Sequence, residues 1–279
     1  MATETSNTID IYGLTDWNEM VKVASAVIIA DANPVGGTIF YIDDTADGVY
    51  EFYDTDGNVI ENVQVGDRPY AYKTVTPGTK DKYYAYHDEI YDNLRWTYYK
   101  DGAYVYESLN TSSNIGSGKT NTETVMTKDN GAYITADSNG YPTIWYQLQQ
   151  VRDAKVGGCD DWFVPSSDEA EELRKAIGFQ IVPDTTKPVI LPAGKVTGGI
   201  IAGTADGQPH YITTANDKHV CYPSATKFLD TGIVTSGEYT YGTSDEVWYW
   251  SYNLQSWANT VAPGTHKQDL NSVFFTRAF

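Results

Sequence analysis

Cys159 and Cys221 are the most obvious candidates for nucleophilic or redox chemistry in this chain of 279 residues. A cysteine reacts through its thiolate, and burial in apolar surroundings keeps the thiol protonated. Two cysteines are too few for a disulfide scaffold, and their separation in sequence leaves a pairing between them open. We predict buried, inert thiols rather than a redox or copper site.

Calcium coordination is the second chemistry that the sequence suggests. The chain is rich in aspartate between residues 43 and 56, with Asp43, Asp44, Asp47, Asp54 and Asp56. An EF-hand loop needs a glutamate at its twelfth position, and none stands there. Aspartate also favours hairpin turns for purely geometric reasons. We therefore predict turns here, with no metal site and no cofactor.

Enzyme motifs are weak or absent. The run Gly-Ser-Gly-Lys-Thr at residues 116–120 is superficially similar to a phosphate loop, but it lacks the leading glycine and a preceding apolar strand. Asp160 and Asp161 are adjacent, so on a strand they would point to opposite faces. We predict that the chain is not an enzyme. A glycan-degrading enzyme stays an alternative, because carboxylates distant in sequence can converge.

Charge and hydropathy exclude several partners. The net charge is −18, which repels phosphate backbones and anionic membranes, so we expect no nucleic acid and no membrane insertion. No apolar run reaches 18 residues, and the first residues, Met-Ala-Thr-Glu-Thr-Ser-Asn, do not have the pattern of a secretory signal.

Tyrosine is abundant, with 23 residues beside 7 tryptophans. These side chains favour strands and also provide rigid, amphipathic contact area at binding surfaces. We interpret the excess as a binding surface. The densest stretch, residues 81–106, contains Tyr83, Tyr84, Tyr86, Tyr91, Tyr98, Tyr99, Tyr104 and Tyr106 around Leu94-Arg95-Trp96.

Three helices are indicated by caps and apolar spacing. Ser166 and Glu169 form a capping box before a helix that Gly178 can end. A second capping box at residues 120–123 predicts a short helix. Pro142 is predicted to start a third, with apolar residues at helical spacing: Ile144, Trp145, Leu148 and Val151.

Strands are indicated in the first part of the chain. Residues 39–42, 49–53 and 58–65 read as strands of hairpins with Asp-Gly turns at residues 47–48 and 56–57. Residues 8–12 alternate like a strand. The apolar pattern of residues 14–29 does not distinguish a helix from a strand, and Asn33-Pro34 is a breaker that ends this segment. Residues 1–35 are either an extra layer or a docking arm, and residues 179–245 read as long loops.

Residues 157–169, Gly-Gly-Cys-Asp-Asp-Trp-Phe-Val-Pro-Ser-Ser-Asp-Glu, resemble a recurring segment of C-type-lectin-like domains. The similar branch includes formylglycine-generating enzymes and phage and bacterial surface modules. Further landmarks in the same order are residues 36–42, the turn at 115–122, Trp-Tyr-Trp-Ser at 248–251 and the closing 274–279. The departures are Tyr252, where a second serine is usual, and long insertions at 43–110 and 179–245.

This resemblance implies an α+β fold of twisted antiparallel sheets with two short helices and long loops. It implies two parts, an N-terminal arm at 1–35 and a lectin-like domain at 36–279, with Trp162 and Trp250 buried. Neither cysteine lies in a context similar to the active site of formylglycine-generating enzymes. The calcium motifs of classical sugar-binding lectins are also missing, since Gln208-Pro209-His210 is the nearest match.

The ligand surface is predicted between the strand at 248–251 and the closing strand. This stretch of about twenty residues reads as a loop, and it mixes aromatics with adaptable hydrogen-bonding groups, as binding loops do. In the modules that the chain resembles, the same stretch lies on the ligand face. The candidate ligand-binding residues are Tyr249, Tyr252, Asn253, Gln255, Trp257, Asn259, His266, Gln268 and Asn271.

The function expected from these observations is non-enzymatic binding. We expect a bacteriophage virion protein of the tail tip, fibre or head fibre, assembled in the host cytoplasm, that recognises a host surface glycan or protein. The N-terminal arm would dock to other virion proteins, and the resemblance implies a homotrimer. The alternative is a bacterial ligand-binding protein of the type diversified by retroelements.

Overall fold

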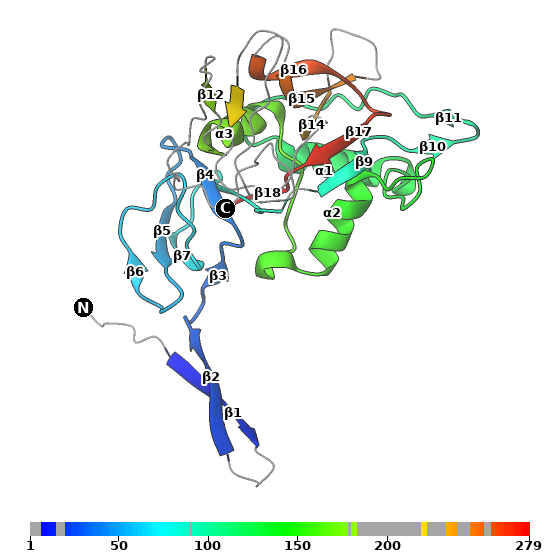
Figure 1. Cartoon of the computed structure of the whole chain (residues 1–279). Coiled ribbons are helices and arrows are strands. Elements are labelled where there is room, and N and C mark those ends of the chain that lie inside the picture. Colours follow the sequence, from blue (N-terminus) through cyan, green and yellow to red (C-terminus); the bar gives the residue numbers. More distant parts are fainter. Residues whose placement is uncertain are drawn as a thin grey trace.

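The computed structural model describes residues 7–14, 20–89, 91–177, 180–182, 219–221, 233–238, 246–253 and 258–279. Within these residues the chain has a mixed α+β architecture of antiparallel sheets and three α-helices (Figure 1). The expected α+β class is confirmed. The two helices implied by the resemblance are wrong, and the three indicated by local signals are present, since the segment at 131–142 separates α1 from α2.

The helices follow their local signals closely. They are α1 (Gly118–Thr127), α2 (Ile144–Asp153) and α3 (Ser167–Ile177). The Thr143 hydroxyl caps α2 by accepting a hydrogen bond from the Tyr146 backbone N–H at 3.2 Å. Helix α1 begins two residues before the predicted capping box, so that box is wrong. Ser117 precedes the helix and makes no side-chain cap.

A three-stranded sheet joins the two ends of the domain. Its order is β18 (Thr276–Ala278), β8 (Tyr83–Tyr86) and β4 (Thr38–Ile42), all antiparallel. Phe163 extends this sheet, because its backbone exchanges hydrogen bonds of 2.7 and 2.9 Å with Thr276. Strand β18 also carries Arg277, whose Nη2 lies 2.9 Å from the Asp161 carboxylate. Three of the segments that carry the resemblance therefore meet here.

A four-stranded sheet packs beside it, in the order β3 (Asn33–Pro34), β7 (Ala71–Thr76), β5 (Val49–Tyr53) and β6 (Val59–Ile60). The hairpin predicted around Asp56-Gly57 is confirmed as β5–β6. The hairpin predicted around Asp47-Gly48 is wrong, because β4 and β5 belong to different sheets. The Phe279 ring, stacked 4.0 Å from that of Tyr72, packs the two sheets together.

The third sheet has five strands. Its order is β16 (Ala258–His266), β15 (Glu246–Asn253), β14 (Ile233–Glu238), β17 (Leu270–Val273) and β9 (Tyr91–Arg95), and β14 runs parallel to β17. The prediction of one long loop from 252 to 271 is wrong. Residues 258–266 pair along β15, so main-chain hydrogen bonding outweighed the loop-favouring composition.

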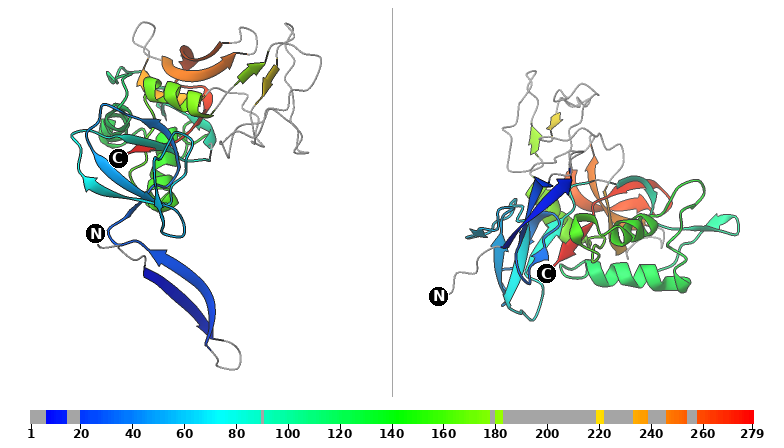
Figure 2. Two further views of the ribbon diagram at one scale, coloured as in Figure 1. Left: turned by 90° about the vertical axis from the view of Figure 1, so that its left-hand side faces the viewer. Right: turned by 90° about the horizontal axis from the view of Figure 1, so that it is seen from below.

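Two hairpins extend from this body. Strands β1 (Asn7–Leu14) and β2 (Met20–Ile28) form an antiparallel ribbon, so residues 20–28 of the ambiguous pattern are a strand (Figures 1 and 2). Strands β10 (Tyr99–Lys100) and β11 (Ala103–Tyr104) form the second hairpin. A further short pair joins β12 (Gln180–Val182) to β13 (His219–Cys221).

The core forms around three tryptophans, Trp96, Trp145 and Trp162, each 0% exposed. Trp96 and Trp145 meet edge to face at 5.2 Å, and the Trp145 indole donates a hydrogen bond of 2.7 Å to the Trp96 carbonyl. The predicted burial of Trp162 is confirmed, while the side chain of Trp250 lies outside the described part.

Glu169 joins two helix starts. Its carboxylate completes the predicted capping box by accepting a hydrogen bond of 2.8 Å from the Ser166 N–H, and it also accepts from Gly116 at 2.8 Å and Gly118 at 3.3 Å. Burial raises the pKa of Glu169 to about 7, although these backbone donors favour its ionised form. Gly118 cannot carry a side chain, because a Cβ there would lie 2.2 Å from this carboxylate.

Candidate binding surface

Two tyrosines contact Arg95, and two more contact Tyr104 and Gln268 beside it. We call this set the tyrosine platform: Arg95, Tyr99, Tyr104, Tyr106 and Tyr141. They come from the end of β9, the β10–β11 hairpin, the strand-free residues after it and the 131–142 segment. Tyr99, Tyr106 and Tyr141 are each 38% exposed. The hairpin that carries two of them extends past β9 in Figure 1.

The β10–β11 hairpin presents its tyrosines because of its turn. Asp101 and Gly102 lie between the paired residues Lys100 and Ala103, with φ of 52° and 87°. Positive φ at both central positions is characteristic of the two-residue turn that matches strand twist, and Asp-Gly is among its preferred sequences. Across this hairpin the rings of the opposed pair Tyr99 and Tyr104 meet edge to face at 5.0 Å.

Arg95 holds the platform together. Its guanidinium carbon lies 5.2 Å from the centre of the Tyr104 ring and 5.1 Å from that of Tyr141. Its Nε donates to the Ser138 carbonyl at 3.0 Å, and its Nη1 donates to the Gln268 carbonyl. One planar cation therefore fixes three chain segments against one another.

Hydrogen bonds position the remaining polar edges. The Tyr106 hydroxyl donates to Oε1 of Gln268, and Nδ2 of Asn139 donates to the Tyr104 hydroxyl at 2.9 Å. Rings held in this way lose little conformational freedom when a partner binds, which favours binding. Three exposed carboxylates stand in the same segments, Asp101, Asp137 and Asp269.

A buried ion pair supports the platform from below. Lys267 is 0% exposed, and its Nζ lies 2.6 Å from Oε1 of Glu238, 2.8 Å from the Glu107 carbonyl and 4.6 Å from the centre of the Trp96 ring. The other oxygen of Glu238 accepts a hydrogen bond of 2.7 Å from the Leu109 N–H. Because Gln268 is the next residue, this pair fixes the turn that contacts Arg95 and the platform tyrosines.

The nine predicted ligand residues fall into three groups by how far the structure describes them: side chain, backbone only, or not at all. Gln268 contacts the platform, whereas Asn271 is 1% exposed and donates to the Asp269 carbonyl at 3.0 Å, so it faces the interior. Gln255 and Trp257 lie outside the described residues. The rest lie on the paired strands β15 and β16, where only the backbone is described: Tyr249, Tyr252, Asn253, Asn259 and His266.

The sequence analysis does not predict the platform as a site. Two features of the sequence could have indicated it: the density of tyrosine at 81–106, and the Asp-Gly turn between Lys100 and Ala103. Tyr141 gave no signal, because it lies in a polar insertion whose approach to Arg95 depends on the folded chain.

The aspartates of 43–56 behave as turn residues. Asp43 accepts from the Thr45 N–H at 2.8 Å and pairs with Lys80 at 2.7 Å. Asp54 accepts from the Asn58 N–H at 2.8 Å within the β5–β6 turn. In the part of the chain that the structure describes, no group of three or more histidine, cysteine or acidic side chains could hold a metal ion.

Cys159 is a free, buried thiol, so it forms no disulfide. Burial raises its pKa to about 11, which keeps it protonated at neutral pH. The predicted burial is confirmed for Cys159, and its inertness stays a prediction, while the side chain of Cys221 lies outside the described part.

Comparison with protein-family models, with curated proteins and with solved structures found no match. Over the described ranges, no helix combines the length and apolar character needed to cross a membrane.

Proposed function

We propose that this chain is a non-enzymatic recognition module that binds a surface glycan through the tyrosine platform. The observation that supports the proposal most is the packing of Arg95 against the rings of Tyr104 and Tyr141, at 5.2 and 5.1 Å from their centres. Rings that offer an apolar face and a polar edge suit a sugar, which has apolar C–H faces and hydroxyl edges. Because these rings are already held in place, binding costs them little conformational entropy.

The ligand we propose is uncharged. Asp101, Asp137 and Asp269 are exposed in the platform segments, and the whole chain has a net charge of −18. A polyanionic glycan would be repelled by this field. Carboxylates can instead accept hydrogen bonds from sugar hydroxyls.

The biological setting we propose is a bacteriophage particle, with the module contacting the host surface, and the finer fold we propose is C-type-lectin-like. Support for the fold comes from the meeting of the resembling segments: β4, residues 157–169 and β18 pack together through Phe163 and the Asp161–Arg277 pair. Support for the setting comes from the sequence resemblance to phage surface modules.

The test is binding of the purified chain to host cells and to immobilised neutral polysaccharide, with Tyr141→Ala against Tyr141→Phe. Truncating an aromatic anchor costs about 2 kcal/mol, roughly a thirtyfold loss of affinity. We expect that loss for the alanine variant and near-parental affinity for the phenylalanine variant, which keeps the ring over Arg95.

Val75→Ala is the control, because Val75 is 58% exposed on β7 and outside the platform. Equal binding by Tyr141→Ala and the parent would refute the platform as the site. Release of new reducing ends from the polysaccharide would refute a purely binding role.

A further inference from the structure

The β1–β2 ribbon has no covering layer in the described structure. Its two strands form a sheet of their own, and the ribbon points away from the body in Figure 1 and in the left view of Figure 2. An isolated two-stranded hairpin is at best marginally stable in water, and its unpaired edges can pair with another chain. This ribbon therefore needs a partner.

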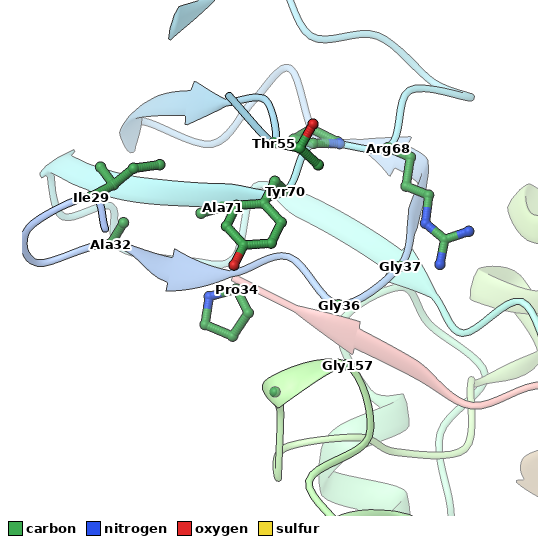
Figure 3. Close-up of a pocket in the computed structure, with 12 residues that line it drawn as sticks. Ile29, Ala32, Pro34, Gly36, Gly37, Thr55, Arg68, Tyr70, Ala71 and Gly157 are labelled. Carbon is green, nitrogen blue, oxygen red and sulfur yellow. The ribbon is translucent and has the colours of Figure 1, made fainter. Parts of the chain in front are cut away.

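A hollow of about 670 Å³ opens at the root of the ribbon (Figure 3). Its walls come from the ribbon's exit at Ile29, from Pro34, from Tyr70 next to β7, and from two glycine turns. Tyr70 is 53% exposed, more than the exposed platform tyrosines at 38% each. We call this hollow the root groove.

The root groove is preformed by close backbone packing. Gly36 and Gly157 have φ of +77° and +64°, and a Cβ on Gly157 would lie 2.7 Å from the Gly36 carbonyl oxygen. Arg277 ties the groove to the body, because it donates to the carbonyls of Pro34 and Val35 and pairs with Asp161. A partner would therefore meet a fixed shape rather than order a loose one.

Charge favours a second copy of this chain as the partner. The molecule has a net charge of −18, so two copies repel over most of their surfaces. The strands of the ribbon balance one aspartate, Asp10, with one lysine, Lys22. The root groove has one charged lining residue, Arg68, which is paired with Asp88. The strands and the groove lining therefore carry no net negative charge of their own, so identical copies repel less here than over the rest of their surfaces.

We propose that the ribbon and the root groove together form the interface through which copies of this chain associate. Like faces meet in a twofold-symmetric pair, the commonest closed homo-oligomer, so each copy contributes a ribbon edge and a groove. The neutral strands extend by main-chain pairing, and the half-exposed Tyr70 becomes buried against the neighbouring copy.

The test is light scattering of the full chain over a hundredfold range of concentration. We expect a mass of at least twice 30.9 kDa for the parent at the higher concentrations. Tyr70→Glu in the groove and Ile9→Pro in the ribbon should each raise the dissociation constant at least tenfold. Tyr106→Glu is the matched control, since it places the same charge on an exposed tyrosine of the platform and should leave the mass unchanged.

A parent that stays at 30.9 kDa at every concentration overturns the proposal. So does assembly of either interface variant with the affinity of the parent. Ala32→Arg, in the lining of the groove, is the second groove variant if circular dichroism shows that Tyr70→Glu does not fold.

Discussion

The buried pair of Lys267 and Glu238 offers the most direct test of the support beneath the platform. Replacing Lys267 by methionine keeps the length of the side chain but leaves the Glu238 carboxylate, whose side chain is 4% exposed, with the Leu109 N–H as its remaining described donor. Removing one partner of a buried ion pair costs about 3–5 kcal/mol, because an uncompensated charge stays behind. The lost cation–π contact with Trp96 at 4.6 Å acts in the same direction.

For a chain of this size each kcal/mol lowers the melting temperature by roughly 2–4 °C, so we expect a decrease of about 6–20 °C. Thermal unfolding followed by circular dichroism measures it. The double variant Lys267→Met with Glu238→Gln should recover much of the loss, because no buried charge remains. The control is Lys155→Met, which removes an exposed pair with Asp160 at 3.2 Å and should cost at most about 1 kcal/mol.

A melting temperature for Lys267→Met within about 2 °C of the parent would refute this reasoning. It would mean that the pair contributes no more than an exposed one. A double variant as unstable as the single variant would instead assign the loss to packing against Trp96 rather than to charge.

Three further predictions concern Glu169, Trp162 and Cys159. The pKa of Glu169 is raised from 4.5 to about 7, so the folded state binds its proton more tightly, and the contribution of this group to stability should fall by about 3 kcal/mol as pH rises between those values. Urea unfolding at pH 5 and pH 7.5 should therefore show a smaller pH dependence for Glu169→Gln than for the parent, and equal dependences would contradict this. Trp162→Ala should lower the free energy of unfolding by about 3–5 kcal/mol, because the ring is fully buried and its indole N–H donates a hydrogen bond of 2.9 Å to the Val156 carbonyl. An unchanged urea midpoint would disprove this prediction. In a Cys221→Ser background, Cys159 should resist a thiol reagent at pH 8 until urea unfolds the chain, because its pKa is about 11; rapid labelling of the folded protein would show the opposite.

Helix positions were largely predictable from sequence, because the signals for them are local. Ser166 and Glu169 lie three residues apart and hydrogen-bond to each other's backbone as the capping box predicts. The apolar spacing of Ile144, Trp145 and Leu148 predicted α2, and all three are fully buried. At residues 120–123 the local signal gave the wrong helix start, because this capping motif lies inside α1.

Sheet membership was not predictable in the same way, because it depends on partners far along the chain. Strands β4 and β5 follow each other within about ten residues, yet β4 pairs with β8 and β5 with β7. Residues 258–266 have a loop-like composition but pair with β15. Burial and main-chain hydrogen bonding with distant segments decided both outcomes.

The candidate surface separates the two kinds of information most clearly. The sequence by itself determined its composition, a tyrosine-rich stretch with an Asp-Gly turn that makes the β10–β11 hairpin present Tyr99 and Tyr104. Only the tertiary structure brought Tyr141 and Gln268 to Arg95, across up to 173 positions of sequence. The reason is physical: a turn closes through hydrogen bonds between near neighbours, whereas a binding surface forms where a packed core places unrelated segments side by side.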